Sequence, residues 1–172
     1  LQRHNALVSV VATAIKRAGG LATIEPRNFD ANSSKQPDIH AHLQNRAYLL
    51  DVTIRNPLSP SQQSQARSLL DTAAHQKSAK YANLAEQSQA QFVPLAFSAL
   101  GGWQSEAISY LENIAGTASQ QYTTSNEERL TSAILRKEIA VTLQRFNARA
   151  IIAWQARAFS HRVHEFHQQH SS

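Results

Sequence analysis

Apolar residues recur every three or four positions in several stretches of the chain, a spacing typical of helices with one buried face. The first such stretch covers residues 3–18 and is followed by Gly19-Gly20, a pair that commonly ends a helix. The second covers residues 69–84 and contains neither glycine nor proline. We expect Ser59 or Ser61 to cap this second helix, because a serine side chain can accept a hydrogen bond from the first turn.

The C-terminal part of the chain has the same pattern and predicts two further helices. One covers residues 104–115, and a polar link at residues 116–125 leads to a longer helix at residues 126–159. A helix of that length either packs along the domain in one piece or breaks near Asn147. Its apolar side is expected to consist of Leu130, Ile134, Ile139, Leu143, Phe146, Ala150, Ile151 and Trp154.

Four shorter apolar runs predict strands. They cover residues 21–25, 39–43, 47–54 and 91–99. Pro94 has no backbone N–H, so we expect the last run at the edge of a sheet or at a bulge. The order helix, three strands, helix, strand and then helices predicts an α/β domain with a mixed sheet. Its core is expected in residues 1–120, with a C-terminal helical extension in residues 121–172.

The second and third strands are separated only by Gln44-Asn45, which predicts a hairpin with a two-residue loop. In such a hairpin, residues whose numbers sum to 89 face each other. Asp38 and Asp51 are then direct cross-strand partners. The hairpin register also sorts the side chains, since they alternate along a strand.

One face of the hairpin is expected to be the core side and the other to carry both aspartates. The core side comprises Ile39, Ala41, Tyr48, Leu50, Val52 and Ile54, and the second face comprises Asp38, His40, Leu49, Asp51 and Thr53. Two carboxylates placed opposite each other repel. They fit a shared divalent cation such as Mg²⁺, which takes one or two carboxylates together with water and phosphate oxygens. The alternative is an ordinary hairpin with solvated aspartates near its ends.

Two other features add candidate residues to this pair. Lys77, Lys80 and Tyr81 are spaced so that they project from one face of the helix after the hairpin. They are expected either to reach a phosphate or a metal-bound water, or to form a solvated basic surface. Glu25, at the end of the first strand, is a candidate third acid near the metal or else a solvent-facing residue.

Charge and composition narrow the possible partners. The 17 Lys and Arg residues outnumber 12 Asp and Glu, and the resulting net charge of +5 favours a polyanionic partner. The chain contains no cysteine, which excludes a disulfide framework and a zinc knuckle within it. No apolar run approaches the roughly 18 residues that span a bilayer, so we expect a soluble domain without a membrane partner. The lack of methionine and the start at Leu1 indicate a piece of a longer polypeptide.

A set of short motifs, taken in order, resembles a known nuclease domain. The spacing of Pro37-Asp38 and Asp51 looks like the PD-(D/E)xK superfamily, in which two acids bind a divalent metal. More closely, the chain is similar to the restriction-like endonuclease domain of early-branching, site-specific non-LTR retrotransposon polyproteins. The motifs that carry this resemblance are RHNAL at residues 3–7, IEP at 24–26, QPDI at 36–39, LLDVTIRNP at 49–57, KSAKY at 77–81 and FVPLAFSALGGW at 92–103.

The resemblance implies a fold and a set of site residues. It implies a restriction-endonuclease-like αβββαβ core in which Asp38 and Asp51 bind Mg²⁺ or Mn²⁺. It also implies that Lys77 is the catalytic lysine, with Lys80 and Tyr81 in the same motif. The wider superfamily carries a lysine two residues after the second acid, where this chain has Thr53. In the retroelement branch the helix supplies the lysine instead.

The resemblance also implies a function. It implies a metal-dependent DNA endonuclease that nicks target DNA by phosphodiester hydrolysis, so that the new 3′ hydroxyl primes reverse transcription. Its partners would be DNA, the reverse transcriptase of the same polyprotein and its RNA, and its location the nucleus. The alternative is an inactive nuclease-like module that binds nucleic acid or a protein partner.

Overall fold

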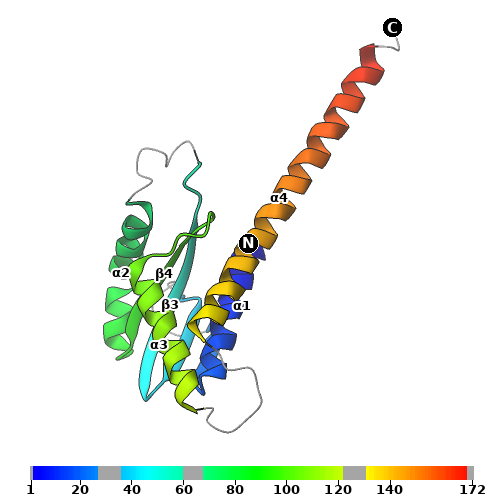
Figure 1. Ribbon diagram of the computed structural model, residues 1–172. Coiled ribbons are helices and arrows are strands. Elements are labelled where there is room, and N and C mark those ends of the chain that lie inside the picture. Colours follow the sequence, from blue (N-terminus) through cyan, green and yellow to red (C-terminus); the bar gives the residue numbers. More distant parts are fainter. Residues whose placement is uncertain (1, 27–35, 60–67, 122–130, 170–172) are drawn as a thin grey trace.

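The computed structural model describes residues 2–26, 36–59, 68–121 and 131–169, which form four helices and one four-stranded sheet (Figure 1). The predicted α/β class with a mixed sheet is confirmed, and so is the order of the elements. They are α1 (Gln2–Arg17), β1 (Leu21–Ile24), β2 (Ile39–Leu43), β3 (Arg46–Arg55), α2 (Leu69–Gln87), β4 (Gln91–Ser98), α3 (Ser105–Gln121) and α4 (Ser132–Gln169). Within the described ranges, no helix is both long enough and apolar enough to cross a membrane.

The strands lie in the order β1-β2-β3-β4. The first three pair antiparallel, while β4 pairs parallel to β3 after the crossover through α2. The strand β4 is therefore an edge strand, as its proline predicted. Pro94 pairs with Asp51 of β3.

The hairpin has the predicted register. Ile39 pairs with Leu50 and Leu43 with Arg46, so paired residue numbers sum to 89. Gln44 and Asn45 form the two-residue turn, with φ angles of 50° and 60°. Positive φ at both turn residues is the type I′ geometry, whose twist matches that of the strands.

Helices cover both faces of the sheet, and Leu49, Leu50 and Val52 point to the faces that the alternation predicted. Leu50 and Val52 of β3 are buried in the main core, which α1, α3 and α4 complete on one side. Leu49 points the other way and is buried with Tyr81 and Leu84 of α2. Full burial of a leucine side chain contributes about 1.5–3 kcal/mol, so Leu49 firmly attaches α2 to the strand that carries Asp51.

The start of α2 differs from the expectation. The helix begins at Leu69, directly after Ser68, so Ser59 is not its N-cap. The Ser59 N–H instead donates to the Asn56 carbonyl, in the turn that follows β3. Ser61 lies outside the described residues.

Helix α3 is longer than predicted and continues through Gly116, where the polar link at residues 116–125 was expected to begin. The helix continues to Gln121, with Ile114 and Ala118 buried one turn apart on its inner face. This buried stripe outweighs the low helix propensity of Gly116. Residues 122–125 of the expected link lie outside the described part of the chain.

Helix α4 is one unbroken helix, and Asn147 connects it to its surroundings instead of interrupting it. The Asn147 side chain donates to the Ala99 carbonyl at 2.7 Å and accepts a bond from Arg3 at 3.1 Å. The described helix begins at Ser132 and extends to Gln169, beyond the expected end at residue 159, while residues 126–130 lie outside the described part.

The first part of α4 packs against the domain. Leu135, Ile139 and Leu143 are buried, whereas Ile151 and Trp154 are 57% and 66% exposed. The expectation of one continuous buried apolar side is therefore wrong beyond the first part. Figure 1 shows the remainder of α4 projecting away from the sheet.

Candidate functional site

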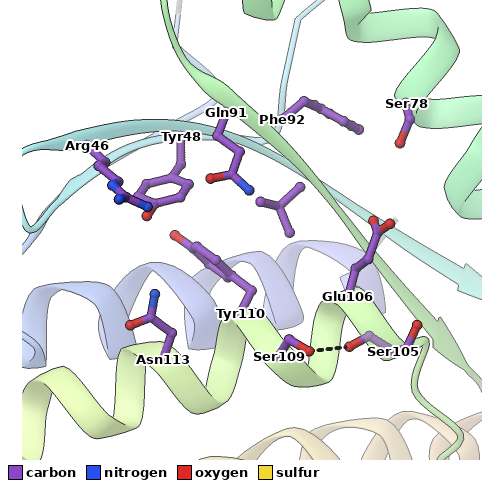
Figure 2. A pocket seen from close by; sticks show the side chains of 11 residues that line it. Arg46, Tyr48, Ser78, Gln91, Phe92, Ser105, Glu106, Ser109, Tyr110 and Asn113 are labelled. Carbon is purple, nitrogen blue, oxygen red and sulfur yellow. Dashed lines mark hydrogen bonds between the residues drawn. The ribbon is translucent and has the colours of Figure 1, made fainter.

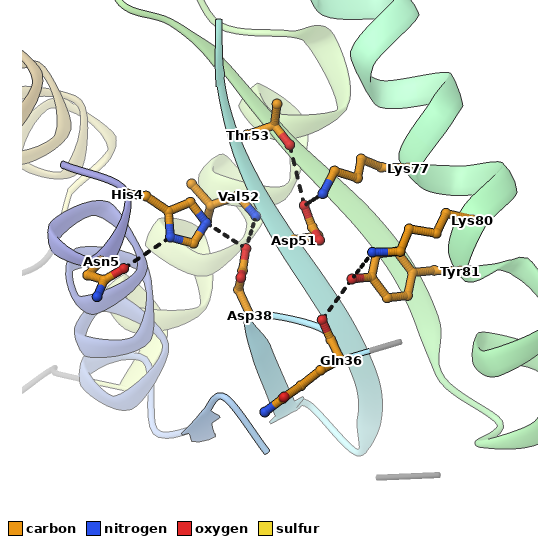
Figure 3. Close-up of polar contacts among 10 residues, drawn as sticks. All are labelled: His4, Asn5, Gln36, Asp38, Asp51, Val52, Thr53, Lys77, Lys80 and Tyr81. Carbon is orange, nitrogen blue, oxygen red and sulfur yellow. Dashed lines mark hydrogen bonds and ion pairs between the residues drawn. The ribbon is translucent and has the colours of Figure 1, made fainter. Parts of the chain in front are cut away.

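Asp51 lies in the middle of β3, under α2, with only 4% of its side chain exposed. Its Oδ2 atom is 2.7 Å from the ammonium nitrogen of Lys77 on α2 and accepts a hydrogen bond from the Thr53 hydroxyl at 3.3 Å (Figure 3). A buried carboxylate is costly unless it is paired and hydrogen-bonded. Lys77 and Thr53 together meet that need.

Asp38 lies just before β2, one residue beyond the last pair of the hairpin, Ile39 with Leu50, so the expected direct pairing of Asp38 with Asp51 is not part of the ladder. Its Oδ2 accepts the backbone N–H of Val52 at 2.6 Å and contacts Nε2 of His4, on α1, at 3.0 Å. Its main-chain carbonyl accepts the N–H of Glu25. These three contacts hold Asp38 between β1, β3 and α1.

The two carboxylates affect each other electrostatically. Burial raises the pKa of Asp38, and the nearby charge of Asp51 raises it further, while the Val52 N–H and His4 lower it in part. Figure 3 shows the Asp38 carboxylate turned toward His4 and the Asp51 carboxylate turned toward Lys77. The two acids are thus neighbours that are stabilised separately and still repel each other.

Lys77 and Lys80 have different surroundings. Lys77 contacts Asp51, whereas the Lys80 ammonium donates to the Tyr81 hydroxyl at 3.2 Å and lies 4.7 Å from the centre of the Tyr81 ring. Of the two lysines in this motif, Lys77 is the one whose ammonium pairs with an acid of the site.

Tyr81 is buried and serves as a support for the segment that leads into Asp38. Its hydroxyl donates to the Gln36 carbonyl at 2.7 Å, and its ring stacks on Phe92 of β4 at 4.9 Å. Burial raises the pKa of Tyr81, with a further contribution from the Asp51 charge. The hydroxyl is accordingly a donor at neutral pH and holds Gln36, two residues before Asp38.

The structure does not bring Glu25 into the acid pair. Glu25 is exposed and has a φ angle of 45° at the end of β1, and it contacts Asp38 through its main-chain N–H. Within the described residues, no three or more His, Asp or Glu side chains form a group that could hold a metal ion. The predicted role of Glu25 as a third metal ligand therefore has no support from its position.

His4 is the residue of this site that the sequence did not reveal. It occurs in the motif at residues 3–7, but a histidine on an N-terminal helix gives no sign of contact with a hairpin that begins 35 residues later. The helix α1 packs against β1, β2 and β3, and this packing brings His4 to Asp38. The motif at residues 3–7 was therefore the only sequence signal for His4, and its contact with Asp38 follows from the packing of α1 on the sheet.

The acid pair has the donor chemistry that a hard divalent ion requires. Mg²⁺ in proteins is bound by one or two carboxylates, with water and phosphate oxygens completing the shell. The repulsion that raises the pKa of Asp38 is the kind that a cation near both carboxylates would relieve. Asp38 and Asp51 are therefore the residues that would hold such an ion.

No protein-family model matches this chain, and no curated protein matches it significantly.

Proposed function

We propose that this domain is a metal-dependent DNA endonuclease with a PD-(D/E)xK core. The observation that carries the proposal is the buried Asp51, which is paired with Lys77 at 2.7 Å and lies near enough to Asp38 for its charge to raise the pKa of Asp38. Two neighbouring acids and a lysine are the residues that metal-assisted phosphodiester hydrolysis uses to hold the ion and to stabilise charge on the phosphate.

The position of the lysine supports the assignment to the retroelement branch of that superfamily. The superfamily lysine is expected at position 53, where Thr53 bonds Oδ2 of Asp51 instead. Lys77 reaches the same oxygen from α2. An ammonium group is thus present at the expected carboxylate, although it comes from a different element.

The reaction would hydrolyse one phosphodiester bond of the DNA with one water molecule and so produce two new strand ends. The water oxygen forms a bond to phosphorus, the bond between phosphorus and the 3′ oxygen breaks, and a proton passes to that oxygen. The products are a 5′ phosphate and a 3′ hydroxyl. Asp38 and Asp51 would hold a Mg²⁺ or Mn²⁺ ion, which would supply the Lewis acidity needed to activate the water and polarise the phosphate.

The protein side chains have separate tasks in this scheme. Lys77 orients the attacking water or offsets negative charge on the phosphate. His4 and the Val52 N–H fix the orientation of the Asp38 carboxylate. Tyr81 holds the main chain at Gln36, and Lys80 in turn donates to the Tyr81 hydroxyl.

In the retrotransposon setting, the 3′ hydroxyl would prime copying of the element RNA by the reverse transcriptase of the same polyprotein. This assigns DNA, that reverse transcriptase and its RNA as partners, and the nucleus as the location. The net charge of +5 supports a nucleic-acid partner.

The second candidate function is an inactive nuclease-like module that binds nucleic acid or a protein. The observation that favours it is the Lys77–Asp51 ion pair, because it already satisfies the buried acid in the absence of a metal. Lys77 would then have a purely structural role, and Thr53 would stand where catalytic members of the superfamily carry their strand lysine.

Plasmid nicking separates the two candidates. Supercoiled plasmid is incubated with the domain and Mg²⁺ or Mn²⁺, and the open-circular form is quantified for wild type, Asp51→Asn, Asp38→Asn and Lys77→Met. We expect nicking by wild type only with metal, and at least a hundredfold loss in each variant, since such groups stabilise the transition state by several kcal/mol. Lys137→Met, a lysine exposed on α4, is the matched control.

Metal-dependent nicking that persists in Asp51→Asn would refute this site. Wild-type protein that binds DNA but never nicks it, with either metal, would establish the binding module instead.

A further inference from the structure

A cavity lies at the edge of the sheet, away from Asp38 and Asp51. It has a volume of about 550 Å³ and is lined by side chains from β3, β4 and α3, with Ser78 of α2 at its border (Figure 2). Pockets that hold small ligands commonly have volumes of roughly 300–1,000 Å³. The cavity is therefore large enough for a molecule the size of a nucleotide.

The part of this cavity that Tyr48 and Tyr110 line is on the opposite face of β3 from Asp51, while Phe92 and Ser78 border it on the α2 side. Tyr48 lines the cavity and stands three positions before Asp51, so the two side chains point to opposite faces. The two positions are also roughly 10 Å apart along the strand, at about 3.3 Å per residue. A ligand in this cavity would not occupy the proposed nuclease site.

The Tyr110 hydroxyl has no hydrogen-bond partner within the described part of the chain, although its oxygen is buried. Tyr110 as a whole is only 6% exposed, and its ring packs edge-on against Tyr48 at 5.1 Å. Burial raises the pKa of Tyr110, so the hydroxyl keeps its proton and can donate. A buried donor without an acceptor is uncommon in folded proteins and calls for an explanation such as a bound ligand.

Other donors gather at the same end of the cavity. Figure 2 shows the Arg46 guanidinium and the hydroxyls of Tyr48 and Tyr110 directed into one region, with the Asn113 amide nearby. Arg46 and Tyr48 are two positions apart in β3 and so share a face. A guanidinium beside two phenol hydroxyls is well suited to a phosphate or carboxylate.

The other end of the cavity has the opposite polarity. Glu106, one turn before Tyr110 on α3, places a carboxylate there. The amide of Gln91, opposite Tyr48 in the sheet, provides both a donor and an acceptor between the two ends. A matching ligand has an anionic group at one end and hydroxyl or amino donors at the other.

We infer that this cavity binds a nucleotide, with its phosphate at Arg46, Tyr48 and Tyr110 and its sugar or base toward Gln91 and Glu106. A nucleotide combines the required anion, the hydroxyl and amino donors and the size. It also fits the basic character of the chain, with its pI near 9.9. The source is either a free mononucleotide or the 5′-phosphorylated end of a DNA strand. This goes beyond the proposed nuclease function and does not depend on cleavage.

Binding can be followed through the side-chain amide signals of Gln91 and Asn113 in ¹H–¹⁵N NMR spectra. Deoxyadenosine 5′-monophosphate is titrated to millimolar concentration, in parallel with deoxyadenosine, with succinate, and with a short single-stranded oligonucleotide that does or does not carry a 5′ phosphate. We expect saturable shifts with the monophosphate, and much weaker ones with the nucleoside and with succinate. The oligonucleotide pair identifies the source, since a strand end requires the 5′ phosphate.

Two variants test the named donors. Tyr110→Phe removes the unpartnered hydroxyl, so it should leave thermal stability equal to or above that of wild type and weaken binding roughly 10- to 100-fold, as expected for a lost bond to a charged group. Arg46→Gln, at an exposed position where folding is not at stake, should weaken binding to a similar degree. Arg149→Gln changes the charge equally, on the distant α4, and should have no effect.

The inference is overturned if the monophosphate causes no saturable shifts at Gln91 and Asn113. It is also overturned if succinate or deoxyadenosine binds as tightly as the monophosphate, or if neither Tyr110→Phe nor Arg46→Gln weakens binding more than Arg149→Gln does.

Discussion

The ammonium nitrogen of Lys77 lies 2.7 Å from Oδ2 of Asp51, whose side chain is almost fully buried. Removal of the lysine leaves a buried charge without its partner. We expect Lys77→Met to lower the free energy of unfolding by about 2 kcal/mol, less than for a fully enclosed pair because Lys77 is 29% exposed. Urea denaturation measures this change.

Lys80→Met is the matched control, since Lys80 contacts Tyr81 and forms no ion pair with an acid within the described residues. Added Mg²⁺ should restore part of the stability of Lys77→Met, because the ion would supply the missing positive charge. Equal effects of the two lysine substitutions would contradict a stabilising role for the Lys77–Asp51 pair.

The stability of the protein is expected to depend on pH through Asp38. Burial and the Asp51 charge raise the pKa of Asp38 above its ordinary value of 3.8 in the folded state. The folded chain then binds this proton more tightly than the unfolded chain, so the free energy of unfolding falls as the pH rises from about 4 through the folded pKa. Asp38→Asn should lack this fall.

Urea denaturation of wild type and Asp38→Asn across a pH series measures the difference. Glu86→Gln, at an exposed carboxylate on α2, is the control. If Asp38 binds Mg²⁺ as proposed, the ion would bind its ionised carboxylate and so shrink the difference between wild type and Asp38→Asn at neutral pH. A difference that is constant over the pH series would contradict the raised pKa of Asp38.

His4 is expected to act by holding Asp38 in place. Groups that orient a metal-binding carboxylate typically account for about 10- to 100-fold in metal affinity or activity. His4→Ala should therefore raise the Mn²⁺ concentration needed for half-maximal plasmid nicking by about tenfold or more. His75→Ala, exposed on α2, should leave this concentration unchanged, and an equal response of the two variants would exclude the positioning role.

Tyr81→Phe isolates the hydrogen bond to Gln36. The ring and its stacking on Phe92 remain, so the expected loss is about 1 kcal/mol in the free energy of unfolding. Amide hydrogen exchange should accelerate around Gln36, while the N–H groups of β4 keep their protection. Unchanged exchange in that segment would show that its position does not depend on the Tyr81 hydroxyl.

Truncation after residue 148 tests whether the projecting part of α4 contributes to the fold. The truncated chain retains the buried Leu135, Ile139 and Leu143 of α4, and Asn147 with its bonds to Ala99 and Arg3. We expect a thermal midpoint within a few degrees of that of the full chain. A broad transition, or one at much lower temperature, would mean that the removed part of the helix makes a stabilising contact.

The hairpin could be predicted from the sequence because its determinants are local. A two-residue turn fixes the register, and alternation along the strands then fixes the faces, as Leu49 and Leu50 illustrate. The edge position of β4 was also readable, since Pro94 lacks the N–H that an interior strand needs.

The contacts of His4 and Lys77 and the exposure of Trp154 could not be predicted, because they depend on packing between segments that are distant in the sequence. The contact of His4 with Asp38 requires the angle between α1 and the sheet, which no local pattern contains. The choice of Lys77 over Lys80 depends on how α2 is rotated on β3, and helical spacing places both lysines on similar faces. The exposure of Trp154 was not predicted, because the spacing of apolar residues defines the apolar face of a helix but does not show whether another element packs on it.

The turn at Gln44-Asn45 makes the chemistry of the site sensitive to chain length. A single residue inserted there would exchange the faces of β3, so that Asp51 would meet the apolar core and Val52 would meet Lys77. Two inserted residues would restore the face but shift the pairing of Asp51 by roughly 7 Å relative to β2. Variation in this loop is therefore expected to be restricted in length and, because both of its residues have positive φ, in composition as well.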